Sequence, residues 1–200
     1  EIAQCLVGSE MCIRDRHRRG GGSVIHIFLK ICGMALVMAS AVLIGRQIAC
    51  GYRKRLLELD ALRRCMMILN NEIAYSSSAL AECFEAASAR CIDKEISEMF
   101  ADMSRLISQA QGERASAIWD SCVNRHEGSL HLTDTDIAEL YNFGKSLGYL
   151  NAQMQTDSIR LYMSVLETQI SDAAAHVDNQ CRAAKTLSIA CGAFVCIILI

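Results

Sequence analysis

The sequence predicts an all-α protein, a helical bundle of about six helices whose first and last helices extend into N- and C-terminal transmembrane segments. The 200 residues include no proline, the residue least compatible with a helix interior. Hydrophobic residues make up 52% of the chain but aromatic residues only 6%, so aliphatic helix formers supply most of the apolar surface. Two apolar runs lie near the two ends of the chain, and its length allows one domain of ordinary size between them.

The charge balance and the cysteine usage exclude some classes of protein. A net charge of −2 at pH 7 argues against a chain that binds nucleic acid by neutralising phosphates. Eleven cysteines would suggest a disulfide framework in a short secreted chain, but here they are scattered and no two are spaced CxxC. We therefore interpret them as reduced thiols that act as small apolar core residues, and we expect no metal or other cofactor.

Both apolar runs are candidates for membrane spans. Residues 24–44, VIHIFLKICGMALVMASAVLI, rise ~30 Å as a helix, which is enough for the hydrocarbon core of a bilayer. Residues 186–200, TLSIACGAFVCIILI, rise only ~22 Å, so this span requires Lys185 to snorkel or the bilayer to thin. The alternative is a pair of buried core helices, which is weakened because residues 192–200 have no polar face.

Basic residues flank the inner end of each span. They are Arg53, Lys54, Arg55, Arg63 and Arg64 after the first span, and Arg182 and Lys185 before the second. By the positive-inside rule, they place the middle domain, residues 45–185, in the cytoplasm and both ends outside. For the five residues after the first span we expect a role in topology and headgroup contact, with docking of a protein partner as the alternative.

The middle domain reads as helices separated by glycine and polar breaks. Its first helix continues from the first span and carries an apolar stripe at a three-four spacing, namely Leu59, Leu62, Met66, Leu69 and Ile73. The serines at 76–78 offer N-caps for a second helix over residues 79–89. Asp93 precedes a third helix that ends before Gly112.

The second half of the domain supplies three more helices. Residues 113–125 predict a fourth helix that faces inward through Ile118, Trp119 and Cys122. Thr133 and Asp136 form a start like a capping box for a fifth helix, which Gly148 ends. Asn151 caps a long last helix with apolar residues at three and four, which runs without a breaker into the second span.

The polar residues suggest no catalytic site. His126, Glu127 and His131 are the nearest approach to a metal cluster, but they sit in a Gly/Ser loop without the i, i+4 spacing of HExxH. Asp134 and Asp136 are better explained by helix capping and the helix dipole than as paired catalytic carboxylates. Tyr141 and Tyr162 are expected to be partly buried core residues.

Three segments carry a resemblance to a known family. They are RLLELDALRRCMMILNNEIAYSSSALAECF (55–84), AIWDSCV (117–123), which contains Trp119, and LTDTDIAELYNFGKSLGYLNAQMQTDSIRLYMSVLE (132–167). Together they resemble the stage III sporulation protein AB family of endospore-forming bacteria, over about residues 27–200. The most specific match is Phe143-Gly144, Leu147-Gly148 and then Gln155, the family's FG..LG followed by a glutamine.

The resemblance implies a function. The cytoplasmic helical domain is expected to be similar to the F-type platform proteins of type II secretion and type IV pilus systems. The chain would be a non-catalytic platform subunit of a secretion-like complex that joins mother cell and forespore, in the mother-cell membrane around the forespore. Its implied partners are the companion secretion-type ATPase, other membrane proteins of the complex and the lipid bilayer, while self-association into a homo-oligomer is left open.

Two departures from the family pattern and two other functional classes remain. The family often has a proline near residues 78–80, and Ser-Asp where this chain has residues 149–151, Tyr-Leu-Asn.

A membrane-anchored helical sensor is one alternative function, but the sequence shows no separate output domain. A platform protein of a type II secretion or type IV pilus system is a second alternative, and a membrane enzyme would need a convergent site that the sequence lacks.

The two glycine pairs of the motif have a physical interpretation. Gly144 would allow a neighbouring helix to approach closely, and Gly148 would supply a left-handed turn that sets the angle between the fifth and last helices.

The opening of the chain does not fit the predicted fold. Residues 5–16, CLVGSEMCIRDR, have no helical or strand period and place arginines on the wrong side of the first span. The codons CTC GTG GGC TCG GAG ATG TGT ATA AGA GAC encode LVGSEMCIRD, residues 6–15, and resemble the transposon adapter used in sequencing libraries. We therefore expect residues 1–16 to be translated adapter and residues 17–23 to be a junction, so Cys5 and Cys12 would not belong to the protein.

Overall fold

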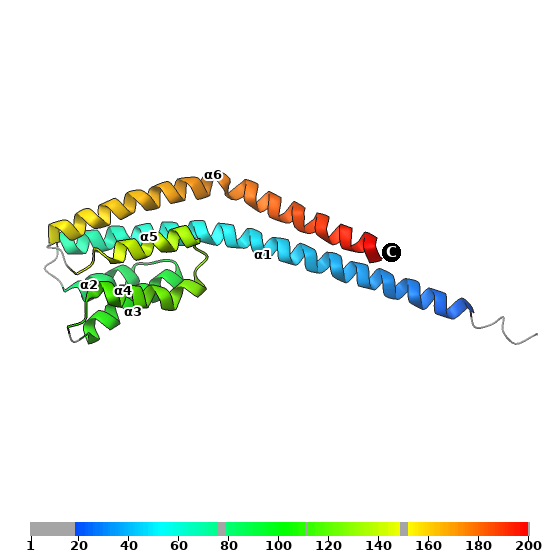
Figure 1. The fold of residues 1–200 in the computed structure, drawn as a ribbon, viewed down its shortest axis with the longest axis horizontal. Coiled ribbons are helices and arrows are strands. Elements are labelled where there is room, and N and C mark those ends of the chain that lie inside the picture. The colour runs from blue at the N-terminus through cyan, green and yellow to red at the C-terminus, as the bar shows by residue number, and fades with distance from the viewer. Residues whose placement is uncertain (1–18, 76–78, 111, 149–151, 200) are drawn as a thin grey trace, which may run out of the picture. The chain divides into compact units, whose positions relative to one another are not determined.

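The computed structural model describes residues 19–75, 79–110, 112–148 and 152–199, with the side chains of 19–26, 152 and 199 left out (Figure 1). The described residues form six α-helices and one short 3-10 helix, and contain no strand. The helices are α1 (Arg19–Tyr75), α2 (Leu80–Ala89), α3 (Lys94–Gln109), α4 (Ala115–His126), η1 (Glu127–Ser129), α5 (Asp134–Gly144) and α6 (Ala152–Leu199). The all-α class is confirmed.

The chain divides into two compact units, and α1 and α6 pass through both. One unit contains α1 up to Arg46 and α6 from Lys185, and the other contains residues 47–184. The predicted opening segment, residues 1–16, lies outside the described residues, as do residues 17 and 18 of the predicted junction.

The first unit is a pair of apolar helix segments that meet through small residues. A Cβ atom added to Gly192 of α6 would lie 2.8 Å from the Cβ of Ala41 and 3.3 Å from the Sδ of Met38, both on α1. The thiol of Cys196 donates to the carbonyl of Met34 at 3.7 Å. Small residues allow this kind of close helix approach in membrane proteins, where lipid tails are as apolar as the side chains.

The outer faces of this pair expose large apolar side chains. Phe28, Leu36 and Ile197 are 68%, 74% and 70% exposed. The helical stretches Ile27–Tyr75 and Gln153–Ile198 are long and apolar enough to cross a membrane, and their most apolar windows are 0% and 11% buried. The alternative of two buried core helices is therefore not what the structure shows.

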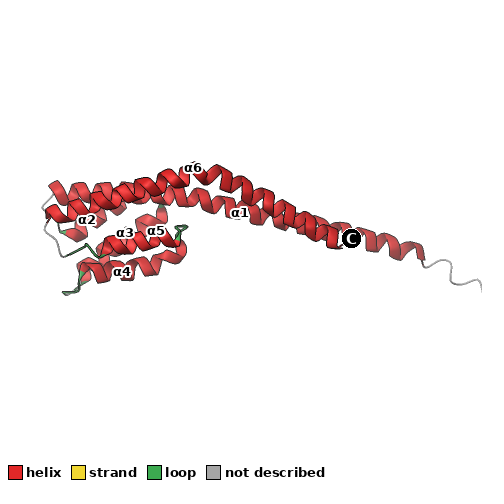
Figure 2. Cartoon of the chain, turned by 45° about the horizontal axis from the view of Figure 1, so that its top comes forward, coloured by secondary structure: helices red, strands yellow, loops and turns green. Residues whose placement is uncertain are grey.

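The second unit is a bundle around one hydrophobic core. α2 packs on α3, α3 on α4 and α4 on α5 (Figure 2). From α1, the predicted stripe contributes Leu59, Leu62, Met66 and Leu69, all at most 1% exposed, while Ile73 is half-buried. The other helices contribute the largest buried side chains, including Phe84, Phe100, Trp119, Leu140 and Leu166.

Helix starts in the bundle follow the predicted caps in two cases and depart from them in one. The Asp93 carboxylate accepts from the backbone N–H groups of Glu95 and Ile96, and Thr133 and Asp136 form the complete capping box at α5. At α2 the N-cap is Ala79, which provides no side-chain bond, so the prediction of a serine cap is wrong for the described residues. Serines 76–78 and Asn151 lie outside them.

Two predicted helix ends differ from those observed. α4 runs two residues later than expected at its start and ends at His126 rather than residue 125. α5 ends at Gly144 and not at Gly148, because the N–H groups of Ser146 and Leu147 donate to the carbonyls three residues before them. This tighter pattern ends the regular α-helix before Gly148 is reached.

Candidate functional site

The junction of α4 and α5 brings together two residues of the family motif. The indole of Trp119 is 1% exposed, and its Nε1 donates to the carbonyl oxygen of Leu140 at 2.9 Å. A Cβ atom at Gly144 would lie 2.8 Å from that Nε1 and 2.9 Å from the indole Cγ, with Cδ1 closer still. The glycine therefore leaves the space that the indole occupies, which is the close helix approach predicted for Gly144.

A line of aromatic rings connects α4, α5 and α6. The rings of Trp119 and Phe143 meet edge to face with centroids 5.2 Å apart, and Phe143 stacks on Tyr162 at 5.0 Å. Such pairs contribute about 0.5–1.5 kcal/mol beyond the area they bury. Leu147 is 2% exposed and belongs to the same core. The motif residues therefore fix how the last helix of the bundle packs on the fifth.

Gly148 follows this junction in a left-handed conformation. Its φ is +84°, and an added Cβ would lie 3.0 Å from the Cβ of Ala115 at the start of α4. The left-handed turn predicted for Gly148 is present, although it comes after a turn of tighter hydrogen bonds and not directly at the helix end. Gln155, the last motif residue, is half-buried in the first turn of α6.

A groove of about 170 Å³ lies between α5 and α6 beside the junction. Phe143 and Tyr162 form its buried apolar floor, and Leu161 on its rim is 70% exposed. The buried hydroxyl of Tyr162 has no hydrogen-bond partner among the described groups, and burial raises its pKa, helped by Asp136 and Glu139. The full lining is Glu139, Asn142, Phe143, Ser146, Ser158, Leu161, Tyr162 and Val165.

Two buried carboxylates connect α1 to the start of α5, and neither pair was predicted. Arg55 donates to Asp136 from Nε at 2.7 Å and from Nη2 at 3.0 Å. Burial would raise the pKa of Asp136, but hydrogen bonds from Arg55 and Thr133 outweigh it and lower the pKa. Arg55 is therefore not an exposed member of the predicted basic group: its side chain is 19% exposed and is held within the bundle.

The second carboxylate is Glu58, one turn further along α1. It is fully buried and accepts from the backbone N–H of His131 at 2.6 Å and lies 2.9 Å from its Nδ1. Burial raises the pKa of Glu58, and the bonds from His131 oppose that rise. Pairs 73 and 81 residues apart leave no local pattern, so sequence spacing could not reveal either of them.

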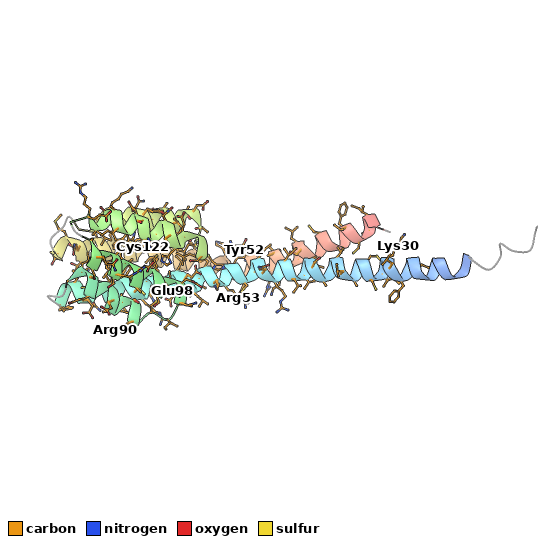
Figure 3. The ribbon with its side chains drawn as sticks, turned by 90° about the horizontal axis from the view of Figure 1, so that it is seen from below. Lys30, Tyr52, Arg53, Arg90, Glu98 and Cys122 are labelled. Atoms are coloured by element: carbon orange, nitrogen blue, oxygen red, sulfur yellow. The ribbon has the colours of Figure 1, made fainter. Side chains whose placement is uncertain are left out.

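The remaining predicted basic residues fall into two sets. Arg63 and Arg64 both pair with Asp60 on their own helix, at 3.1 and 2.9 Å. Arg53 is exposed on α1 (Figure 3). Lys54 is half-buried, and within the described part of the chain neither residue forms an ion pair. Of the five predicted basic residues, Arg53 and Lys54 are therefore the two that form no ion pair among the described residues.

The three residues considered as a metal cluster have separate partners. His126 lies 3.0 Å from Asp102 through Nε2, and His131 bonds to Glu58. Glu127 accepts from the half-buried Tyr141 hydroxyl at 3.1 Å. Over the described residues, no three His, Cys, Asp or Glu side chains are grouped as metal ligands would be.

These features define a class: an all-α bundle whose first and last helices continue into apolar segments. The chain belongs to the stage III sporulation protein AB family, whose model matches residues 30–200. Stage III sporulation protein AB of Bacillus subtilis (strain 168) is 22% identical over 171 residues, which cover 86% of this chain and 99% of that protein. The solved structure of a stage III sporulation protein AB, SpoIIIAB, has a TM-score of 0.57 and 22% identity, and covers 62% of this chain and 96% of its own.

Proposed function

We propose that this chain is a non-catalytic, membrane-anchored platform subunit of the secretion-like complex that joins mother cell and forespore, and that it docks the companion secretion-type ATPase. Membership of the family gives the chain a role in sporulation. The observation that carries the platform role is the continuity of α1 and α6, which supply both the apolar segments and two sides of the bundle core.

Anchoring in the bilayer rests on the exposed faces of the apolar helix pair. Exposing large apolar side chains such as Phe28 and Leu36 to water costs free energy, whereas the same side chains are stable in contact with lipid tails. Arg53 and Lys54 follow the first apolar segment, which favours the mother-cell cytoplasm for the bundle under the positive-inside rule. The supporting contacts in the bundle are structural ion pairs, such as Arg55 with Asp136, which agrees with a non-catalytic role.

The topology can be tested with one introduced thiol. Ile92 is 83% exposed in the loop after α2, so Ile92→Cys gives an accessible probe without disturbing the core. In a background whose native cysteines are replaced by serine or alanine, a membrane-impermeant maleimide should label it only after the cell is opened. Labelling in intact cells would contradict a cytoplasmic bundle.

For the docking surface we propose the groove between α5 and α6. Its floor is apolar and its rim exposes Leu161, a combination that suits an apolar anchor from a partner. The floor residue Phe143 also belongs to the family motif, so one motif residue forms part of the groove wall. Glu139 on the lining adds a preference for a basic group next to that anchor.

The docking proposal is tested by retention of the ATPase on the full-length chain in detergent. Leu161→Arg should reduce retention at least tenfold, because it places a charge at the rim of an apolar groove. The matched control is Leu57→Arg, which changes an equally exposed leucine, 64% exposed, on α1. Equal retention by both variants and the unchanged chain would exclude this groove as the site, and no retention by the unchanged chain would contradict the docking role itself.

A further inference from the structure

The groove between α5 and α6 is lined by two helix faces. Eight residues form the lining, four from α5 and the turn that follows it and four from α6. They are Glu139, Asn142, Phe143, Ser146, Ser158, Leu161, Tyr162 and Val165. Both sets of four have the spacing i, i+3, i+4, i+7, which is the spacing of one face of a helix. Because the side-chain ridges of one helix pack into the grooves of others, such a channel has the form that a further helix fits.

The exposed apolar surface of the groove continues along α6 beyond the lining. Leu161 on the rim is 70% exposed, and Met154, seven residues before it, is 50% exposed. Seven residues are about two helical turns, so the two side chains start from nearly the same side of α6, roughly 10 Å apart along its axis. Large apolar side chains exposed together on one face are typical of protein interaction sites. Met154 therefore extends the apolar surface of the groove by two turns.

The charge of the groove comes from Glu139. This residue is half-buried on the lining, and among the described residues it forms no ion pair and no hydrogen bond. A half-buried carboxylate beside an apolar floor has lost part of its hydration without gaining a cation. A lysine or arginine of a bound segment would supply that cation.

We propose that the segment bound in this groove is a single amphipathic helix of the secretion-type ATPase. It would carry two apolar anchors at i and i+7, one on Met154 and one on Leu161, and a lysine or arginine that pairs with Glu139. The inference rests on the proposed function and adds to it the kind of segment that docks. Helices that bind in grooves use anchors at this spacing. An extended strand fits less well, because the described residues contain no strand whose edge it could join.

The second anchor is tested by retention of the ATPase on the full-length chain in detergent. Met154→Arg should lower retention at least threefold, although Met154 is not on the groove lining. The matched control is Gln153→Arg, which adds the same charge at an exposed neighbour that points about 100° away around α6. Its retention should equal that of the unchanged chain. Both positions are exposed, so neither variant should change the thermal midpoint of the bundle.

The charge pairing is tested by removing one carboxylate. Glu139→Gln should lower retention about threefold to tenfold at low salt and weaken its dependence on salt. The thermal midpoint should not fall, because Glu139 has no partner among the described residues. Glu113→Gln is the control, since Glu113 is an exposed acid in the α3–α4 loop and forms no ion pair among the described residues. Equal retention by both variants would contradict the pairing.

The helical form of the bound segment is tested by photo-crosslinking. The apolar crosslinker p-benzoylphenylalanine replaces Met154 in one variant and Leu161 in another, and mass spectrometry locates the linked residues of the ATPase. Both variants should link to one segment, at residues about seven apart. Links to two separate segments, or to every second residue of one segment, would overturn the inference.

The outcomes separate this inference from the docking role on which it rests. If Leu161→Arg loses retention but Met154→Arg does not, the groove still docks the ATPase and the two-anchor helix is wrong. If the unchanged chain retains no ATPase, the docking role and this inference are both wrong.

Discussion

Replacement of Gly144 by alanine tests the junction of α4 and α5 most directly. The added methyl group would lie within 2.8–2.9 Å of the Nε1 and Cγ atoms of Trp119, closer than carbon atoms in real structures approach. Because the indole is 1% exposed and packed on Phe143, it has no empty space to move into. The substitution must displace it and disturb its hydrogen bond to Leu140.

The expected cost combines two effects. Overpacking of a well-filled core costs about 1–3 kcal/mol, and a buried donor that loses its acceptor costs about 1–3 kcal/mol more. The free energy of unfolding should therefore fall by about 2–6 kcal/mol, a large part of the about 5–15 kcal/mol typical of a domain. For a bundle of this size the thermal midpoint should fall by roughly 5–20 °C.

Differential scanning calorimetry of the full-length chain in detergent measures this shift. Gly128→Ala is the matched control, because Gly128 has no atom within 4 Å of an added Cβ and should change the midpoint by less than about 2 °C. Trp119→Phe shrinks the ring that the methyl group meets, so the double variant with Gly144→Ala should lose less stability than the sum of the two. Additive losses, or a Gly144→Ala midpoint equal to that of Gly128→Ala, would refute the reasoning.

Other substitutions test the backbone turn and the buried ion pair. Gly148 and Gly112 both have a positive φ, 84° and 86°, so alanine strains the backbone at either position. Gly148→Ala should lower the thermal midpoint more than Gly112→Ala, because only at Gly148 would the added Cβ also lie 3.0 Å from the Cβ of Ala115. Equal shifts of the thermal midpoint for the two variants in calorimetry would show that the contact with Ala115 does not destabilise the folded state. Asp136→Asn should cost about 2–4 kcal/mol in unfolding experiments, since it leaves Arg55 without its counter-charge, and adding Arg55→Met should recover part of that loss. The folded-state pKa of Asp136 lies below its unfolded value of 3.8, so its contribution is complete at neutral pH and is lost as the pH falls through 3.8 towards the folded-state pKa. Acid unfolding of Asp136→Asn should then show a weaker dependence on pH in that range, and an unchanged dependence would contradict this assignment.

Local patterns in the sequence predicted the elements of the fold because their causes are local. The three-four spacing of Leu59, Leu62 and Met66 places all three on the buried face of α1. The capping box of Thr133 and Asp136 acts over three residues, so it is visible in the sequence and present in the structure. Both predictions depend only on the geometry of a single helix.

The site could be predicted only in part, because its contacts join distant residues. Trp119 and Gly144 were both singled out by the family pattern, but their contact depends on how α4 packs on α5. In the sequence Arg55 is one of a run of basic residues, and nothing in the sequence indicates that it pairs with Asp136, 81 positions away. The end of α5 was placed at Gly148 because a glycine is a strong stop signal, whereas tighter hydrogen bonds end the helix earlier.

The position of Trp119 also has a practical consequence, because it is the only tryptophan in the 200 residues. Light absorbed at the red edge of the protein spectrum excites this one indole, so its emission reports on the α4–α5 junction and on no other part of the chain. In the folded bundle the ring is shielded from water and bonded to Leu140, so its emission should be blue-shifted. Partner binding at the motif can therefore be followed through the fluorescence of Trp119, without adding a label.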